Sequence, residues 1–165
     1  MPGRRKYLTY NIPDCAGEWM RASPDAHNDY VRTIDNKLNG RVKALIRFIK
    51  AWKFYRNVPL SSFYLELRVA KYAETEQTIV FDEDVYRVFR MLYNNDLAAI
   101  QDPMGISGNV QACKTWLMLD DARSKVLTAF NRSEKAWTAA QHGKTRDAFD
   151  QWRLLYDDAF PSYYR

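Results

Sequence analysis

Residues 41–67, RVKALIRFIKAWKFYRNVPLSSFYLEL, predict two helices and the turn that joins them. In the first part, 41–56, apolar side chains recur at helical spacing on one face: Val42, Leu45, Ile46, Ile49 and Trp52. Residues 57–60 include Pro59 and break the helix, and the next helix is expected from about Ser61 to Glu76. Consecutive helices with so short a connection pack antiparallel, which indicates a helical bundle.

Helix signals continue on both sides of this pair. Ser23-Pro24-Asp25 is typical of a helix start, and Gly40 of its end. Further helices are predicted from the acids at 82–84 to about 94–95, from about 120 to 141, and from Thr145 to a point before Pro161, with a loop at 102–109. The fold class is therefore mainly α, a bundle of about five to six helices over residues 21–165.

The N-terminal segment has a different pattern. Residues 5–12, RKYLTYNI, are rich in β-formers and predict a strand that ends at Pro13-Asp14. No second strong strand follows, and a lone strand is not stable. Residues 1–20 are accordingly expected to be an extended remnant whose strand pairs outside the helical domain.

Composition limits the class of protein. Hydrophobic residues make up 47% of the 165 residues, enough for a folded core. No apolar run approaches the roughly 18 residues that span a bilayer, and no apolar signal segment follows the N-terminus, which predicts a cytoplasmic protein without membrane association. Cys15 and Cys113 form no metal or redox motif and are expected to be inert thiols.

The net charge of +5 is unevenly distributed. Residues 1–75 carry +7 and residues 76–165 carry −2. Within the basic half, Lys43, Arg47 and Lys50 share a stripe beside the apolar face of the 41–56 helix. Such a stripe attracts phosphates, and the alternative interpretation is an ordinary solvated face without a ligand. Lys53 lies near the helix end, where the dipole and an apolar stem explain it without a ligand.

Ser61 and Ser62 open the following helix. One of them is expected to be the N-cap, a common structural role. The exposed N–H groups of a helix start, with a hydroxyl beside them, also bind anions. If the two helices are antiparallel, Lys50 and Ser62 should face one gap, where a polyphosphate would be bound. Phe63 follows at once and is either a core residue or a surface on which a nucleobase stacks.

Other candidate chemistry is weak. Asp82 and Asp84 form a D-x-D, but on a helix they point to nearly opposite sides, and acids favour a helix start without any metal. His27 and His142 stand alone in the sequence. No catalytic site and no metal site is predicted from the residues themselves.

Several blocks in order, YNIPD…GEWM…SPDAHNDYV, then ALIRFIKAWKFYRNVPLSSFYLEL, QDPMG…GNV and AFDQWRLLYDDAFPSYY, resemble the C-terminal helical part of bacterial cGAS/DncV-like nucleotidyltransferases (CD-NTases). This group belongs to the superfamily of animal cyclic GMP-AMP synthase, oligoadenylate synthase and poly(A) polymerase. The resemblance implies synthesis of cyclic or linear oligonucleotide messengers from nucleoside triphosphates, ATP or GTP, in anti-phage defence. It implies that Lys50 and Ser62 contact the donor triphosphate and that Phe63 stacks on the base, with Arg47, Lys53 and Ser61 nearby.

One departure from this family is decisive for activity. The Gly-Ser turn followed by D-x-D and a third aspartate, which hold two Mg²⁺ in the family's N-terminal domain, has no counterpart in this sequence. The leading hypothesis is therefore a nucleotide-binding half that is inactive alone and needs a separate or missing catalytic domain, with Mg²⁺ only there. The alternatives are a stand-alone nucleotide-sensing or protein-docking module and, third, a helical domain that binds nucleic acid.

Overall fold

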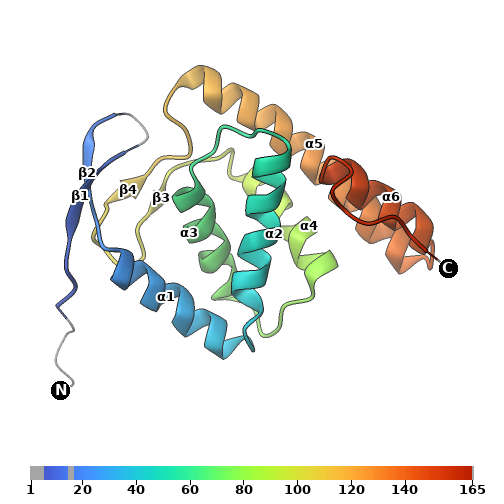
Figure 1. Cartoon of the computed structure of the whole chain (residues 1–165), viewed down its shortest axis with the longest axis horizontal. Helices are drawn as coiled ribbons and strands as arrows, with labels where there is room; N and C mark the ends of the chain where they lie inside the picture. Colours follow the sequence, from blue (N-terminus) through green and yellow to red (C-terminus); the bar gives the residue numbers. More distant parts are fainter. Residues whose placement is uncertain (1–5, 15–16, 165) are drawn as a thin grey trace.

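The computed structural model describes residues 6–14 and 17–164. Residue 5 of the predicted strand and Cys15 lie outside this part. The described chain has six helices and two short strand pairs, which confirms the mainly α class (Figure 1). The helices are α1 (Pro24–Lys37), α2 (Arg41–Tyr55), α3 (Ser62–Ala73), α4 (Phe81–Asn94), α5 (Trp116–Gln141) and α6 (Thr145–Leu155).

The turns around α1 and α2 follow from local chemistry. Ser23 caps α1, since its hydroxyl accepts a hydrogen bond from the Ala26 N–H at 3.4 Å, and Pro24 is the first helical residue. Asn39 and Gly40 both have positive φ, at 56° and 75°. This left-handed pair ends α1 and reverses the chain into α2, as the glycine predicted.

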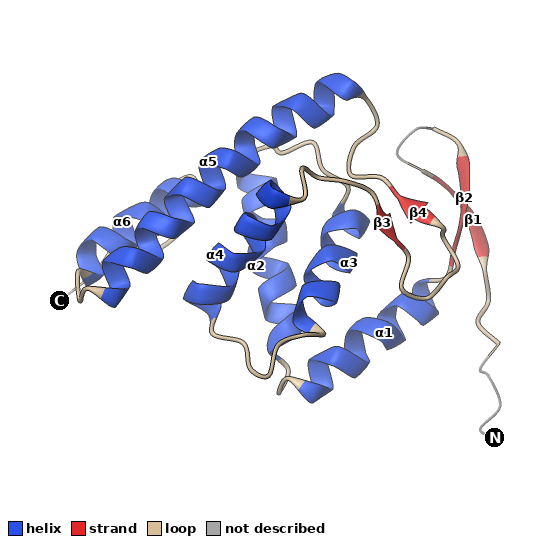
Figure 2. Cartoon of the chain, turned by 180° about the vertical axis from the view of Figure 1, so that it is seen from behind, coloured by secondary structure: helices blue, strands red, loops and turns tan. Residues whose placement is uncertain are grey.

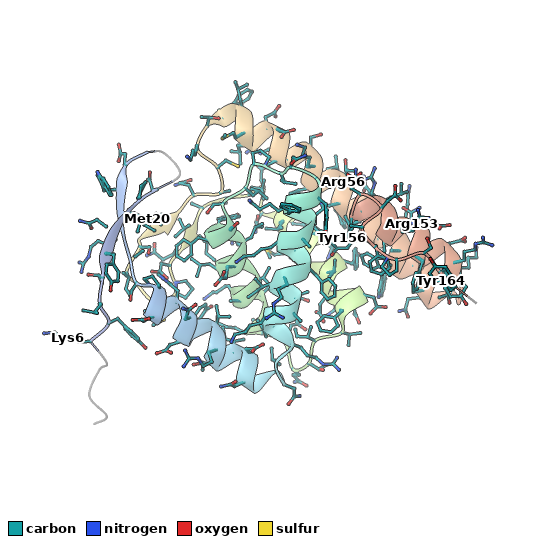
Figure 3. All side chains as sticks on the ribbon, in the orientation of Figure 1. Lys6, Met20, Arg56, Arg153, Tyr156 and Tyr164 are labelled. Atoms are coloured by element: carbon teal, nitrogen blue, oxygen red, sulfur yellow. The ribbon has the colours of Figure 1, made fainter. Side chains whose placement is uncertain are left out.

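The core lies between α2, α3 and α4. The predicted apolar face of α2 is confirmed, because Val42, Leu45, Ile46, Ile49 and Trp52 are all buried. The indole of Trp52 is 1% exposed and meets the ring of Phe89 on α4 edge-on, with centroids 4.8 Å apart. Arg56, just after α2, holds its end against α6 through a 3.1 Å ion pair between its Nη1 and an Asp157 carboxylate oxygen; Figure 3 labels it there.

Helices α5 and α6 pack on each other, and α5 lies along α4 (Figure 2). The start of α5 was predicted about four residues late. Thr115 is its N-cap, with its hydroxyl 3.2 Å from the Met118 N–H, so the helix begins before the acids that suggested a start at 120. Of the helices described, none is long and apolar enough to cross a bilayer.

The expectation of a single unpaired strand was wrong. Strand β1 (Tyr10–Pro13) pairs antiparallel with β2 (Trp19–Ala22), in a register that places Tyr10 opposite Ala22 and Pro13 opposite Trp19. The β2 sequence WMRA lacks the alternating pattern of a strand, so only its partner identifies it. A second pair, β3 (Ile100–Gln101) and β4 (Asn109–Val110), forms at the ends of the predicted loop. Figure 1 shows both pairs on the side of the bundle nearest the N-terminus.

Candidate functional site

The predicted basic stripe lines a hollow between α1, α2 and α3. This basic hollow has a volume of about 420 Å³. Its charged and polar lining comprises four cations, one carboxylate and one carboxamide: Arg32, Lys43, Arg47, Lys50, Glu66 and Asn28. The excess of positive charge suits an anionic ligand.

Lys50 has an ionic partner that the sequence argument overlooked. Its Nζ lies 2.5 Å from Oε2 of Glu66 on α3, and the two side chains are 35% and 26% exposed. Glu66 and Ser62 are four residues apart and share a face of α3. Lys50 therefore reaches the face of α3 that begins at Ser62, and this spacing was a signal from which Glu66 could have been predicted.

The two serines have different roles. Ser61 is the N-cap of α3, because its hydroxyl accepts from the Tyr64 N–H at 3.2 Å. Its own N–H donates to the Ala112 carbonyl at 2.8 Å, which ties the helix start to the segment after β4. Ser62 is the first residue of α3 and is exposed. The structural role predicted for one serine thus belongs to Ser61, and the hydroxyl of Ser62 is accessible to a ligand.

Phe63 lies in a second hollow of about 250 Å³, beneath the β1–β2 hairpin. Both apolar and polar residues line this hairpin hollow: Ile12, Pro13, Met20, Phe63, Val110, Asp14, Ser61, Asn109, Gln111 and Lys114. Figure 3 labels Met20 on the hairpin. Of the predicted site residues, Arg47 and Lys50 line the basic hollow, whereas Ser61 and Phe63 line the hairpin hollow. Lys53 is half-buried in the last turn of α2, where its charge complements the helix dipole.

His27 does not stand alone in the fold. Its Nε2 is 3.0 Å from Oδ2 of Asp102, and the side chains are 6% and 0% exposed. The imidazole also meets Phe63 edge-on, with centroids 4.8 Å apart. Asp102 in turn accepts hydrogen bonds of 2.8–2.9 Å from the N–H groups of Met104, Ile106 and Ser107. One carboxylate therefore orders the 102–110 loop and fixes the histidine on which Phe63 rests.

These contacts predict a specific pH dependence of stability. Burial raises the pKa of Asp102. The hydrogen bonds from Ser107, His27, Met104 and Ile106 lower it by more than burial raises it, so the pKa is below its ordinary value. A carboxyl whose pKa is depressed in the folded state stabilises the fold above its unfolded pKa and loses this contribution as pH falls through the folded pKa. We expect the free energy of unfolding to decrease from about pH 4 downwards. Urea unfolding at several pH values should show that the free energy of unfolding of Asp102→Asn decreases less steeply with falling pH than that of the unchanged chain. Equal decreases in the two proteins would contradict a stabilising role of the Asp102 carboxylate.

The acids of the D-x-D separate as predicted. Asp84 is buried, where it accepts hydrogen bonds from the Tyr72 hydroxyl and, at 2.6 Å, from the Val80 N–H. Asp82 is half-buried and lines a hollow together with Phe48 and Trp152. Within residues 6–14 and 17–164, no three His, Cys, Asp or Glu side chains are grouped so that they could hold a metal ion.

Two curated proteins match nearly the whole chain. A probable cyclic nucleotide synthase of Bacillus cereus (strain VD146) is 26% identical over 157 residues, covering 93% of this chain and 46% of the relative. A cyclic AMP-AMP-AMP synthase of Acinetobacter sp. (strain ATCC 27244 / 9458) is 26% identical over 172 residues, covering 94% and 48%. The chain thus spans about half the length of the curated relatives it matches. No family model matches it.

A solved structure shares the fold. The E. coli MS115-1 CdnC:HORMA-deltaN complex contains a chain that superposes with a TM-score of 0.71 over 94% of this chain and 58% of its own length, at 17% identity. The arrangement of helices described above is therefore found in a protein of known structure.

Proposed function

Because this chain is related to the cGAS/DncV-like nucleotidyltransferases, we propose that it is the helical half of such an enzyme. In this proposal residues 21–165 hold the donor nucleoside triphosphate for synthesis of a cyclic or linear oligonucleotide messenger in anti-phage defence. The observation that supports it is the basic hollow, in which Lys50 lies against Glu66 of α3, four residues after Ser62.

The charge distribution supports a triphosphate as the ligand. Four cations line the basic hollow together with one carboxylate, Glu66, and two of these cations also have carboxylate partners, Arg32 with Asp29 at 3.2 Å and Lys43 with Asp35 at 4.0 Å. A phosphate that enters would replace Glu66 as the partner of Lys50, because a triphosphate carries more charge than a carboxylate. The exposed hydroxyl of Ser62 and the free N–H groups of the α3 start would bind neighbouring oxygens. Phe63, in the hairpin hollow, would stack on the base.

Catalysis in this proposal comes from another domain. The sequence lacks the Gly-Ser and D-x-D motif that binds Mg²⁺ in the family. The hairpin and the segment before it also expose apolar side chains that a partner domain would cover, since Leu8 is 67%, Tyr10 53% and Trp19 74% exposed. The same surface supports the alternative of a protein-docking module, because a partner that covers these side chains need not be catalytic.

We expect Lys50→Ala to weaken ATP binding by about tenfold to a hundredfold, since a charge-assisted hydrogen bond contributes about 1.5–3 kcal/mol. The measurement is isothermal titration calorimetry of the chain with ATP, GTP and inorganic tripolyphosphate. Lys135→Ala is the matched control, because it removes the same charge from an exposed site on α5. Equal affinity of Lys50→Ala and the unchanged chain would overturn the site.

Two further variants separate the parts of the proposal. Glu66→Gln removes the competing carboxylate and should strengthen tripolyphosphate binding. Phe63→Leu should weaken ATP binding and leave tripolyphosphate binding unchanged, because stacking involves only the base. If Phe63→Leu weakens both ligands equally, the ring has a structural role and does not contact the base.

A further inference from the structure

An aromatic groove lies on the part of the bundle where α2, α4 and α6 meet, and the proposed function leaves it unused. Its volume is about 210 Å³. Five rings and one carboxylate line it: Phe48 from α2, Phe81 and Asp82 from α4, Trp152 from α6, and Tyr156 and Phe160 from the segment that follows. A cavity of about 150 Å³ is enough for benzene, so this groove has room for a small organic molecule.

The rings that line the groove pack on one another. Phe48 and Phe81 meet at 60° with centroids 5.3 Å apart. Phe160 stacks on Tyr156 with centroids 6.2 Å apart and is tilted against Trp152 with centroids 6.4 Å apart. Aromatic rings attract cations, so a groove lined by five of them favours a cationic ligand over an anionic one. Phe81 already has one cation over its ring, since the Arg41 guanidinium carbon is 5.6 Å from the ring centroid.

Two polar groups distinguish the groove from a plain apolar surface. Asp82 forms no hydrogen bond or ion pair with any of the described residues, so its charge is available to a ligand. It lies in the first turn of α4. Tyr156 is 5% exposed, and its buried hydroxyl has no hydrogen-bond partner among the described residues. An acceptor atom on a ligand would satisfy this hydroxyl. Figure 3 labels Tyr156 beside α6.

We propose that this groove binds a small alkylated ammonium compound, with the cationic head enclosed by the rings and paired with Asp82. The aromatic walls replace the hydration shell of a weakly hydrated quaternary ammonium. They cannot replace that of a bare ammonium, which is strongly hydrated and needs several acceptors. A hydroxyl or carboxylate on the same molecule would bind Tyr156. This site is separate from the basic hollow and does not depend on the triphosphate proposal.

The test compares choline with 3,3-dimethylbutan-1-ol, a neutral molecule of the same shape that has carbon in place of nitrogen. Calorimetric or NMR titration of the full chain should show that choline binds at least tenfold more tightly. Asp82→Asn should reduce choline affinity to that of the neutral molecule, while Asp150→Asn, the same charge change on exposed α6, should leave it unchanged. Phe160→Leu should weaken choline more than the neutral molecule.

Three results would overturn the proposal. Equal affinities for the charged and the neutral molecule would leave only an apolar groove. If Asp82→Asn binds choline as tightly as the unchanged chain does, the carboxylate is not part of the site. Tighter binding of a peptide that carries trimethylated lysine would assign the groove to a protein partner instead of a free small molecule. Far-UV circular dichroism and a thermal melt of each variant ensure that any loss is measured on folded protein.

Discussion

Replacing Asp102 by alanine should lower the free energy of unfolding by about 3–5 kcal/mol, the range measured when one member of a buried pair is removed. The substitution takes away the acceptor of four hydrogen bonds. It leaves His27 and the N–H groups of Met104, Ile106 and Ser107 without their partner in a buried site. Each unpaired donor costs about 1–3 kcal/mol unless water reaches it.

Urea unfolding followed by far-UV circular dichroism measures this loss. Asp120→Ala, an exposed acid on α5, is the control and should change stability by less than about 0.5 kcal/mol. Asp102→Ala should also alter the NMR signals of the Phe63 ring, because Phe63 contacts His27. A loss below about 1 kcal/mol would mean that the loop keeps its shape without the carboxylate.

Trp52→Ala should destabilise the chain to a similar extent, by about 3–5 kcal/mol, because it empties the largest buried site of the core. The indole lies between α2 and α4 and contacts Phe89 edge-on. Its removal costs both the transfer of apolar surface and the cavity that remains. Since α2 also carries Lys50, the basic hollow should lose its shape together with the core.

Five tryptophans make fluorescence ambiguous, so circular dichroism is again the suitable probe. Trp52→Phe keeps most of the volume and should lose clearly less than the alanine variant. Trp116→Ala provides the matched control, since this indole is 69% exposed at the start of α5. A loss for Trp52→Ala no larger than that for Trp116→Ala would show that the core does not depend on the α2–α4 contact.

Local chemistry was sufficient for most helices of this chain. The apolar face of α2, the Ser23 cap, the Gly40 turn and one serine cap on α3 were all predictable, because a period of 3.6 residues and a capping hydroxyl act within a few positions of sequence. The start of α5 was misplaced for a related reason. Trp116 and Leu117 are exposed apolar residues in the first turn, so the apolar pattern does not indicate the helix start there. The only local signal for it is the Thr115 cap.

Pairing between distant residues was not predictable in the same way. The WMRA strand, the Lys50–Glu66 ion pair and the His27–Asp102 contact each join segments that local patterns describe separately. His27 and Asp102 are 75 residues apart, and no periodicity or cap links them. The aromatic groove is of the same kind, since its rings come from α2, α4, α6 and the segment after α6.

By itself, the sequence determined the helical class, the basic first half and the positions where α2 ends and α3 begins, because periodicity, charge and capping are carried by neighbouring residues. Only the tertiary structure decided which acid meets Lys50, what holds the 102–110 loop and which rings enclose a common space. Those contacts depend on how the helices pack, and the packing is a property of the whole core.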